Sequence, residues 1–131
     1  MSGWSLVNKT TEELVVRNLE VADSFWDRFK GLQFRRGLAR DSGLLLVPCG
    51  SIHTMFMRFP IDVVMLSSKG EILLAKRSLK PWSMQTAPPG TFAVLELPAE
   101  SASVEPGNVL QLTSSVQKSP RLPESLRFLC S

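Results

Sequence analysis

Short apolar runs that end at glycine or proline recur along most of this chain of 131 residues. The runs are rich in β-branched and aliphatic residues, which suit a half-buried pleated surface. A Ser-Lys-Gly turn at residues 68–70 separates two of them, as in a β-hairpin. Strand-like runs occupy residues 5–10, 13–22, 44–47, 51–59, 61–67, 71–79, 91–97 and 109–115. The pattern predicts a mainly β fold, a compact antiparallel barrel or sandwich.

One segment changes period and predicts a short helix over residues 24–31. Four bulky apolar residues fall there at helical spacing, namely Phe25, Trp26, Phe29 and Leu32. Asp23 or Ser24 can cap its start, and Gly31 can end it. Residues 98–105 could add one helical turn. One or two short helices place the fold at the margin of the α+β class and are too few for a Rossmann-like fold.

The length of the chain indicates a single domain. An apolar fraction of 44% and a charged fraction of 21% are those of a globular protein. We expect residues 1–115 to form one mainly β domain, which needs neither a disulfide nor a metal to fold. Residues 116–131 contain two prolines and little patterning. They are expected to be a C-terminal tail that packs loosely or binds a partner.

Charge and hydropathy limit the kinds of partner and the cellular compartment that we expect for this chain. The net charge is +3, and the basic residues are scattered, the densest group being Arg35, Arg36 and Arg40. Without a basic stripe or a glycine-rich phosphate loop, we expect no nucleic-acid partner. The start of the chain shows no signal peptide, and no apolar run is long enough to span a membrane. We expect a cytoplasmic protein in which Cys49 and Cys130 are reduced. The sequence leaves the oligomeric state open, with a monomer as the default.

The most concentrated chemistry lies in residues 48–57, which hold Cys49 and the single histidine, His53. On an extended strand one face would carry Ser51, His53, Met55, Met57 and Phe59. Three interpretations stay open: a packed histidine, a Cys–His nucleophilic pair, and a metal site. A metal is the weakest, because zinc needs three or four protein ligands. We therefore expect no bound metal and no cofactor.

Two acidic residues interrupt apolar strands, Asp62 in residues 61–67 and Glu96 in residues 91–97. A buried charge is costly without a partner, and the candidate partners are Arg35, Arg36 and Arg58. Trp82, in the proline-rich loop 81–90, could act as an aromatic lid. These acids could also be solvated at strand ends or form structural ion pairs. The alternative is one small polar cleft, formed by Arg35, His53, Arg58, Asp62, Trp82 and Glu96.

The order of these motifs resembles the domain of unknown function 192 family over roughly residues 15–113. The resemblance rests on a Gly-Leu start and an arginine, a Pro-x-Asp strand, a Leu-Glu strand and a glycine turn. The matching residues are Gly31, Leu32, Arg35, Leu38, Gly43, Met57, Pro60, Asp62, Gly70, Leu95, Glu96 and Gly107. The family pattern differs at Gln33, Arg58, Phe59 and Glu100. The resemblance implies a compact, mainly β domain and names no activity.

Three functions remain compatible with these residues. The leading hypothesis is a non-catalytic ligand-binding or accessory module with a small polar cleft. The first alternative is a small enzyme that uses Cys49 and His53. The second is a protein-interaction domain that uses the basic link and the tail.

Strand alternation generates a first test. Met57→Ala should lower the free energy of unfolding by about 2–5 kcal/mol, the usual loss for a buried methionine. His53→Ala should cost less, because this side chain is expected at the border between core and cleft. Thermal denaturation of both variants measures the difference. Equal losses would make His53 a core residue, and a harmless Met57→Ala would mean that the strand register is wrong.

Overall fold

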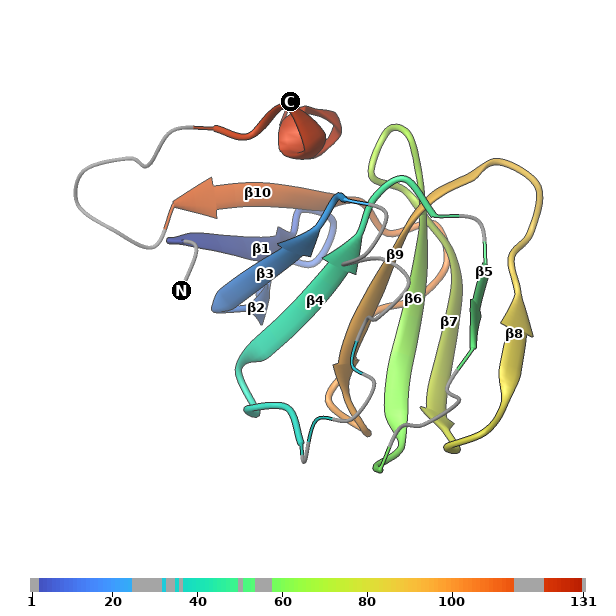
Figure 1. Cartoon of the computed structure of the whole chain (residues 1–131). Coiled ribbons are helices and arrows are strands. Elements are labelled where there is room, and N and C mark those ends of the chain that lie inside the picture. Colours follow the sequence, from blue (N-terminus) through green and yellow to red (C-terminus); the bar gives the residue numbers. More distant parts are fainter. Residues whose placement is uncertain are drawn as a thin grey trace.

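The structure is a computed structural model, and it describes residues 3–24, 32, 35, 37–49, 51–53, 58–114 and 122–130. For residues 51–53 the description is that of the backbone. Strands dominate this part of the chain, as the sequence predicts (Figure 1). They are β1 (Trp4–Asn8), β2 (Glu13–Val16), β3 (Asn18–Ala22), β4 (Ser42–Leu46), β5 (Ser51–His53), β6 (Ile61–Ser67), β7 (Ile72–Leu79), β8 (Met84–Thr86), β9 (Thr91–Pro98) and β10 (Leu110–Ser114), followed by a short 3-10 helix, η1 (Glu124–Leu129).

The strands form three sheets. A three-stranded sheet has the order β10-β1-β2, and a five-stranded sheet has the order β3-β4-β9-β6-β7. β5 and β8 pair as a separate ribbon beside β7 (Figure 1). In the described residues each sheet keeps two edge strands, so the architecture is a sandwich and not a closed barrel.

Both faces of the five-stranded sheet are buried. On one face, Leu19, Leu45 and Leu95 pack with Leu6 and Leu112 of the three-stranded sheet in a first apolar cluster. On the other face, a second cluster includes Leu44, Leu46, Ile61, Val63 and Val94, with Leu32 from the β3–β4 connection. Double burial explains why β6 and β9 are nearly continuous apolar runs.

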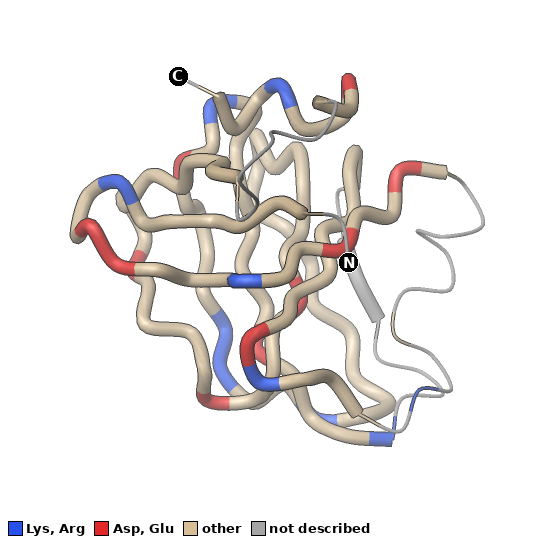
Figure 2. The backbone as a smooth tube through the Cα atoms, turned by 90° about the vertical axis from the view of Figure 1, so that its left-hand side faces the viewer, with Lys and Arg blue, Asp and Glu red and all other residues tan. Residues whose placement is uncertain are grey.

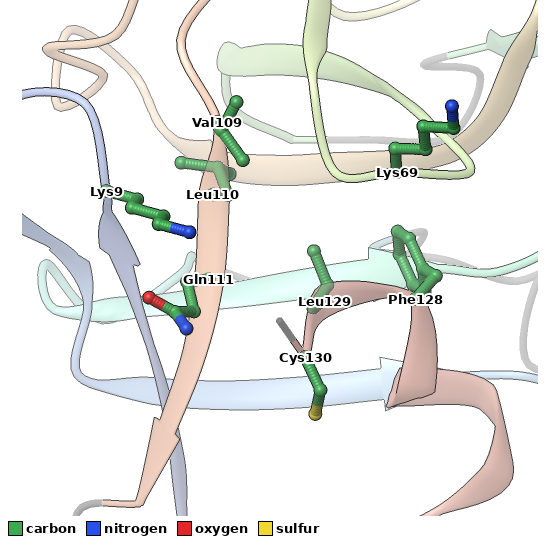
Figure 3. Close-up of a pocket in the computed structure, with 8 residues that line it drawn as sticks. All are labelled: Lys9, Lys69, Val109, Leu110, Gln111, Phe128, Leu129 and Cys130. Atoms are coloured by element: carbon green, nitrogen blue, oxygen red, sulfur yellow. The ribbon is translucent and has the colours of Figure 1, made fainter.

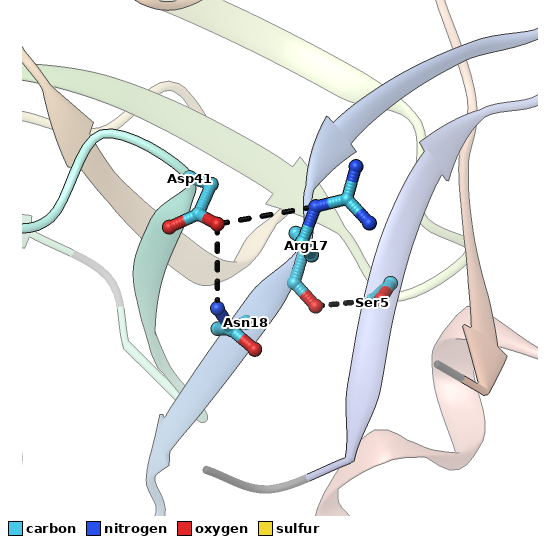
Figure 4. A network of polar contacts seen from close by, with 4 residues as sticks. All are labelled: Ser5, Arg17, Asn18 and Asp41. Atoms are coloured by element: carbon cyan, nitrogen blue, oxygen red, sulfur yellow. Dashed lines mark hydrogen bonds and ion pairs between the residues drawn. The ribbon is translucent and has the colours of Figure 1, made fainter. Parts of the chain in front are cut away.

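The prediction of one strand over residues 13–22 is wrong, because the chain changes sheets at Arg17. Ser5 Oγ donates a hydrogen bond of 2.6 Å to the Arg17 carbonyl, and the Asn18 amide and the Arg17 guanidinium both face the Asp41 carboxylate (Figure 4). The backbone N–H groups of Arg17 and Asn18 also donate to the Asp41 carbonyl. These contacts hold the corner between β2 and β3.

The sheet is also not wholly antiparallel. β3 pairs with β4 in parallel, from Asn18 opposite Ser42 to Ala22 opposite Leu46. A parallel pair needs a long crossover, and residues 23–41 supply it. The helix predicted over residues 24–31 falls in this crossover, and residues 25–31 lie outside the described part of the chain.

The local predictions fare better than the distant ones. The β6–β7 hairpin is confirmed, with Val64 opposite Ala75. The expected strand 51–59 is described as a strand only over β5, and residues 54–57 lie outside the described residues. No helical turn forms at residues 98–105, which make turns and irregular backbone. Residues 122–130 do not pack loosely: Leu126 and Leu129 are buried in the first cluster, and Phe128 meets Phe92 edge to face.

Close approach of the two sheets at Gly43 generates a prediction. A Cβ on Gly43 would lie 2.9 Å from Leu97 Cδ2 and 3.0 Å from Val16 Cγ2. Gly43→Ala should therefore destabilise the fold by about 1–3 kcal/mol through overpacking. The matched control is Gly37→Ala, since a Cβ there meets nothing within 4 Å. Chemical denaturation measures both, and equal midpoints would contradict the close packing.

Candidate functional site

Asp62 is fully buried and is held by the backbone of two distant segments. Its Oδ1 accepts hydrogen bonds of 2.8 Å from the N–H groups of Ser78 and Glu100, and its Oδ2 accepts one of 2.9 Å from Ala102. Strand alternation places this carboxylate on the face of the first cluster, to which Ala102 belongs. The prediction that Asp62 contacts an arginine is therefore wrong, because main-chain donors hold the charge instead. These hydrogen bonds hold the end of β7 and the segment after β9 against β6.

Glu96 points to the opposite face of the same sheet. It lies opposite Leu44 of β4 and Val63 of β6, both members of the second cluster. The residue is 2% exposed, and within the described part of the chain its Oε1 has no hydrogen-bond partner. Burial raises the pKa of Glu96 to about 8, against the opposing charge of Arg35. At neutral pH the carboxyl group therefore keeps its proton.

Arg35, whose charge acts on this carboxyl group, lies in the β3–β4 connection. Its Nη1 lies 3.0 Å from Oε2 of Glu20, and its Nη2 lies 3.4 Å from Glu20 Oε1. Glu20 is opposite Leu44, which is opposite Glu96, so both glutamates lie in one row across three strands. The Arg35 side chain is 37% exposed and that of Glu20 is 44% exposed. The row therefore extends from the half-exposed Glu20 to the buried Glu96.

Among the six predicted cleft residues, Arg35 and Glu96 interact through charge. Glu20 joins them, and the sequence pattern does not reveal it, because an acidic residue on a half-exposed strand has no distinctive signature. The pairing of Glu20 with Leu44 could have been found only from the parallel register of β3 and β4.

The other predicted residues lie elsewhere or fall outside the described side chains. Trp82 is 61% exposed, with a φ of 63°, in the turn before β8. Arg58 is exposed just before β6. His53 is opposite Met84 in the β5–β8 ribbon, and its side chain lies outside the described part of the chain, as do Met55 and Met57.

Cys49 is half-buried beside the second cluster, on the same side of the sheet as Glu96. Its backbone N–H donates to the Phe92 carbonyl at 2.8 Å. In the described structure neither Cys49 nor Cys130 is part of a disulfide. The contact between Cys49 and the His53 ring stays a prediction.

A pocket of about 140 Å³ lies away from the predicted residues, between β10, the β6–β7 turn and η1. Lys9 and Gln111 stand on one side, and Leu129 and Cys130 lie opposite them (Figure 3). Its lining contains no predicted site residue.

Charges of both signs are interspersed along the described backbone (Figure 2). Within the described ranges, no three His, Cys, Asp or Glu side chains gather as a metal site. No helix in this part of the chain is long and apolar enough to cross a membrane.

The family model that matches this chain is DUF192, described as an uncharacterized ACR, and it matches residues 6–112. The chain belongs to the DUF192 family. This confirms the resemblance drawn from the sequence, and both Glu96 and Asp62 lie inside the matched region. The family description supplies no activity.

The names of the curated relatives of this DUF192 chain give no activity. A UPF0127 protein of Pyrococcus furiosus is 32% identical over 114 residues, which cover 81% of this chain and 96% of the relative. One from Thermococcus sibiricus is 31% identical over 98 residues, or 71% of this chain. That match spans 62% of the T. sibiricus protein.

A solved structure has the same fold. The crystal structure of a protein of unknown function from Novosphingobium aromaticivorans aligns with a TM-score of 0.72 and 20% identity, and the alignment covers 82% of each chain. At this identity the likeness supports the mainly β sandwich alone.

The backbone contacts of Asp62 generate a prediction for this DUF192 domain. Asp62→Ala leaves the N–H groups of Ser78, Glu100 and Ala102 without their acceptor. We expect a loss of about 3 kcal/mol in the free energy of unfolding, measured by chemical denaturation. Asp41→Ala, at a carboxylate that is 52% exposed, is the control and should cost less. Equal losses would mean that the three bonds contribute little.

The buried Glu96 carboxyl group makes stability depend on pH. In the unfolded chain a glutamate ionises near its ordinary pKa of 4.5, whereas folded Glu96 keeps its proton up to about pH 8. The contribution of Glu96 to stability is therefore complete at low pH and is lost as the pH rises through this window. Glu96→Gln stays neutral, so its gain in Tm over the unchanged protein should grow from pH 5 to pH 8. A gain independent of pH would show that Glu96 is ionised when folded.

Proposed function

We propose that this domain is a non-catalytic module that binds a small polar ligand at Glu96, with Arg35 and Glu20 at the entrance. The observation that supports the proposal is the buried Oε1 of Glu96, which has no hydrogen-bond partner among the described residues. Leaving a buried polar atom unsatisfied costs about 1–3 kcal/mol. A ligand that supplies the missing hydrogen bond would recover that free energy.

The surroundings of Glu96 favour a ligand-binding role over a purely structural one. A structural carboxylate is expected to be satisfied within the fold, as Asp62 is by three backbone N–H groups. A strongly shifted pKa beside a specific charge is also typical of functional sites. The Arg35–Glu20 pair is half-exposed, and we infer that a polar ligand would enter beside it.

The alternative, a small enzyme, would use Cys49 as the nucleophile with His53 as its base. The half-buried position of Cys49 beside the second cluster keeps this alternative open. Cys49→Ser separates the two functions, because it should abolish turnover by such an enzyme and leave the binding proposed for Glu96 unchanged.

The test compares Glu96→Leu with the unchanged protein. Leucine removes the unsatisfied group and keeps an apolar contact with Leu44 and Val63, so the empty variant should melt at a higher temperature. A thermal-shift panel of small amines, alcohols, sugars and carboxylates should stabilise only the unchanged protein. A Glu96→Leu variant that melts lower, or that responds to the same compounds, would refute binding at Glu96.

A further inference from the structure

Trp82 occupies a turn position that a tryptophan does not favour. Residues 81–82 form the turn between β7 and β8, and Trp82 has a φ of 63°. A proline followed by a residue with positive φ is the arrangement of a type II turn, whose third position normally holds glycine or asparagine. A bulky side chain in this conformation is an outlier that costs conformational free energy. The turn alone therefore does not explain why residue 82 is a tryptophan.

Packing does not explain Trp82 either, because its side chain faces solvent. Trp82 is 61% exposed, and Met84, two residues further along, is 75% exposed. Only Leu14 is a comparable exposed apolar side chain in the part of the chain that the structure describes. Tryptophan and methionine are enriched in protein interfaces, where a buried tryptophan often contributes much of the binding energy. An aromatic residue that is both exposed and conformationally unfavourable points to a binding role.

The surface around this turn is basic. Arg77 and Lys80 are exposed at the end of β7, and Arg58 is exposed just before β6. Because Ile61 of β6 is opposite Leu79 of β7, the three cations lie toward the same end of the sheet. This is the end at which β7 leads into β8 (Figure 1). Three exposed positive charges there favour a partner that carries negative charge.

Asp62 fixes the backbone at this end of the sheet. The N–H groups of Ser78 and Glu100 both donate to its Oδ1 at 2.8 Å, and these two residues also have positive φ values, of 50° and 60°. Glu100 is exposed, and its single negative charge does not balance the three cations. Since the buried carboxylate holds both segments, the surface is preorganised and loses little conformational entropy when it binds a partner.

β8 adds an open strand edge next to Trp82. Within the described ranges β8 pairs with β5 alone, with Ile52 opposite Gln85. β5 lies between β7 and β8, so the other edge of β8 faces away from the sandwich (Figure 1). The N–H and C=O groups of such an edge can pair with an extended peptide. A membrane surface or a nucleic acid makes no ladder of this kind, so the open edge favours a peptide.

We propose that Trp82 and the edge of β8 bind an extended acidic segment of a partner protein. The backbone of the segment pairs with β8, and one of its apolar side chains packs on Trp82 and Met84. Its carboxylates face Arg58, Arg77 and Lys80. This surface does not use the Glu96 carboxyl group, so the proposal is independent of the ligand proposed for that site.

A phage-displayed library of random dodecapeptides tests the proposal directly. The library is depleted on Trp82→Gly and then selected on the unchanged protein. We expect the enriched peptides to combine several acidic residues with an apolar one. Calorimetric binding of a selected synthetic peptide should weaken about tenfold in Trp82→Gly and also in the double variant Arg77→Gln, Lys80→Gln. Added salt should weaken it further. Trp82→Gly should keep its Tm, because glycine adopts a positive φ without strain.

Strand pairing has its own readout, an N-methyl scan of the selected peptide. Alternate residues of an added strand donate to its neighbour, so binding should be lost at every second methylated position. Leu14→Gly is the matched control, because it removes an exposed apolar side chain from β2, in another sheet, and it should bind the peptide normally.

Three results would overturn the proposal: no enriched peptide, a consensus without acidic residues, or equal binding by Trp82→Gly and Leu14→Gly. A scan without alternation would overturn the strand pairing. Phosphatidylserine vesicles and oligothymidylate are tested in parallel. If either binds through Trp82 while no peptide is enriched, the surface belongs to a membrane or a nucleic acid instead.

Discussion

Burial of the five-stranded sheet on both faces is the constraint on which the rest of the molecule depends. A sheet with one solvated face can turn its charged residues toward water, whereas β6 and β9 have no such face. Each of these strands nevertheless carries one acidic residue, Asp62 or Glu96, and both are almost fully buried. Because Asp62 is opposite Leu97 and Val63 is opposite Glu96, the two acids point to opposite faces.

The fold handles these two carboxylates in different ways. Asp62 receives three backbone N–H groups from segments far apart in the chain, and it thereby positions the loops at one end of the sheet. Glu96 experiences the charge of Arg35, which is already paired with Glu20, and within the described residues its own Oε1 has no hydrogen-bond partner. The hydrogen bonds of Asp62 are therefore supplied by the protein itself. The buried charge of Glu96 has to be neutralised by a proton or by an external partner.

How well the sequence predicts a feature depends on how far apart in the chain the contacting residues lie. The β6–β7 hairpin depends on a three-residue turn, and its prediction is confirmed. The corner at Arg17 depends on Asp41, so the local pattern of residues 13–22 could not indicate it. Glu96 and Asp62 could be picked out as charges within apolar strands. The backbone donors of Asp62 could not be predicted, because they have no side-chain signature, and Glu20 could not be, because its position depends on the parallel register of β3 and β4.

The three-stranded sheet joins opposite ends of the described chain, since β1 pairs with β10 from Trp4 opposite Ser114 to Asn8 opposite Leu110. The side chains of Asn8 and Asn108 are also hydrogen-bonded, at 2.9 Å. During synthesis on the ribosome, β1 can pair with β2 at once, but β10 emerges only after almost the whole domain has been made. Until then β1 exposes an unpaired edge. A chain cut short before β10 would expose that edge permanently, so aggregation of nascent or truncated chains should begin there.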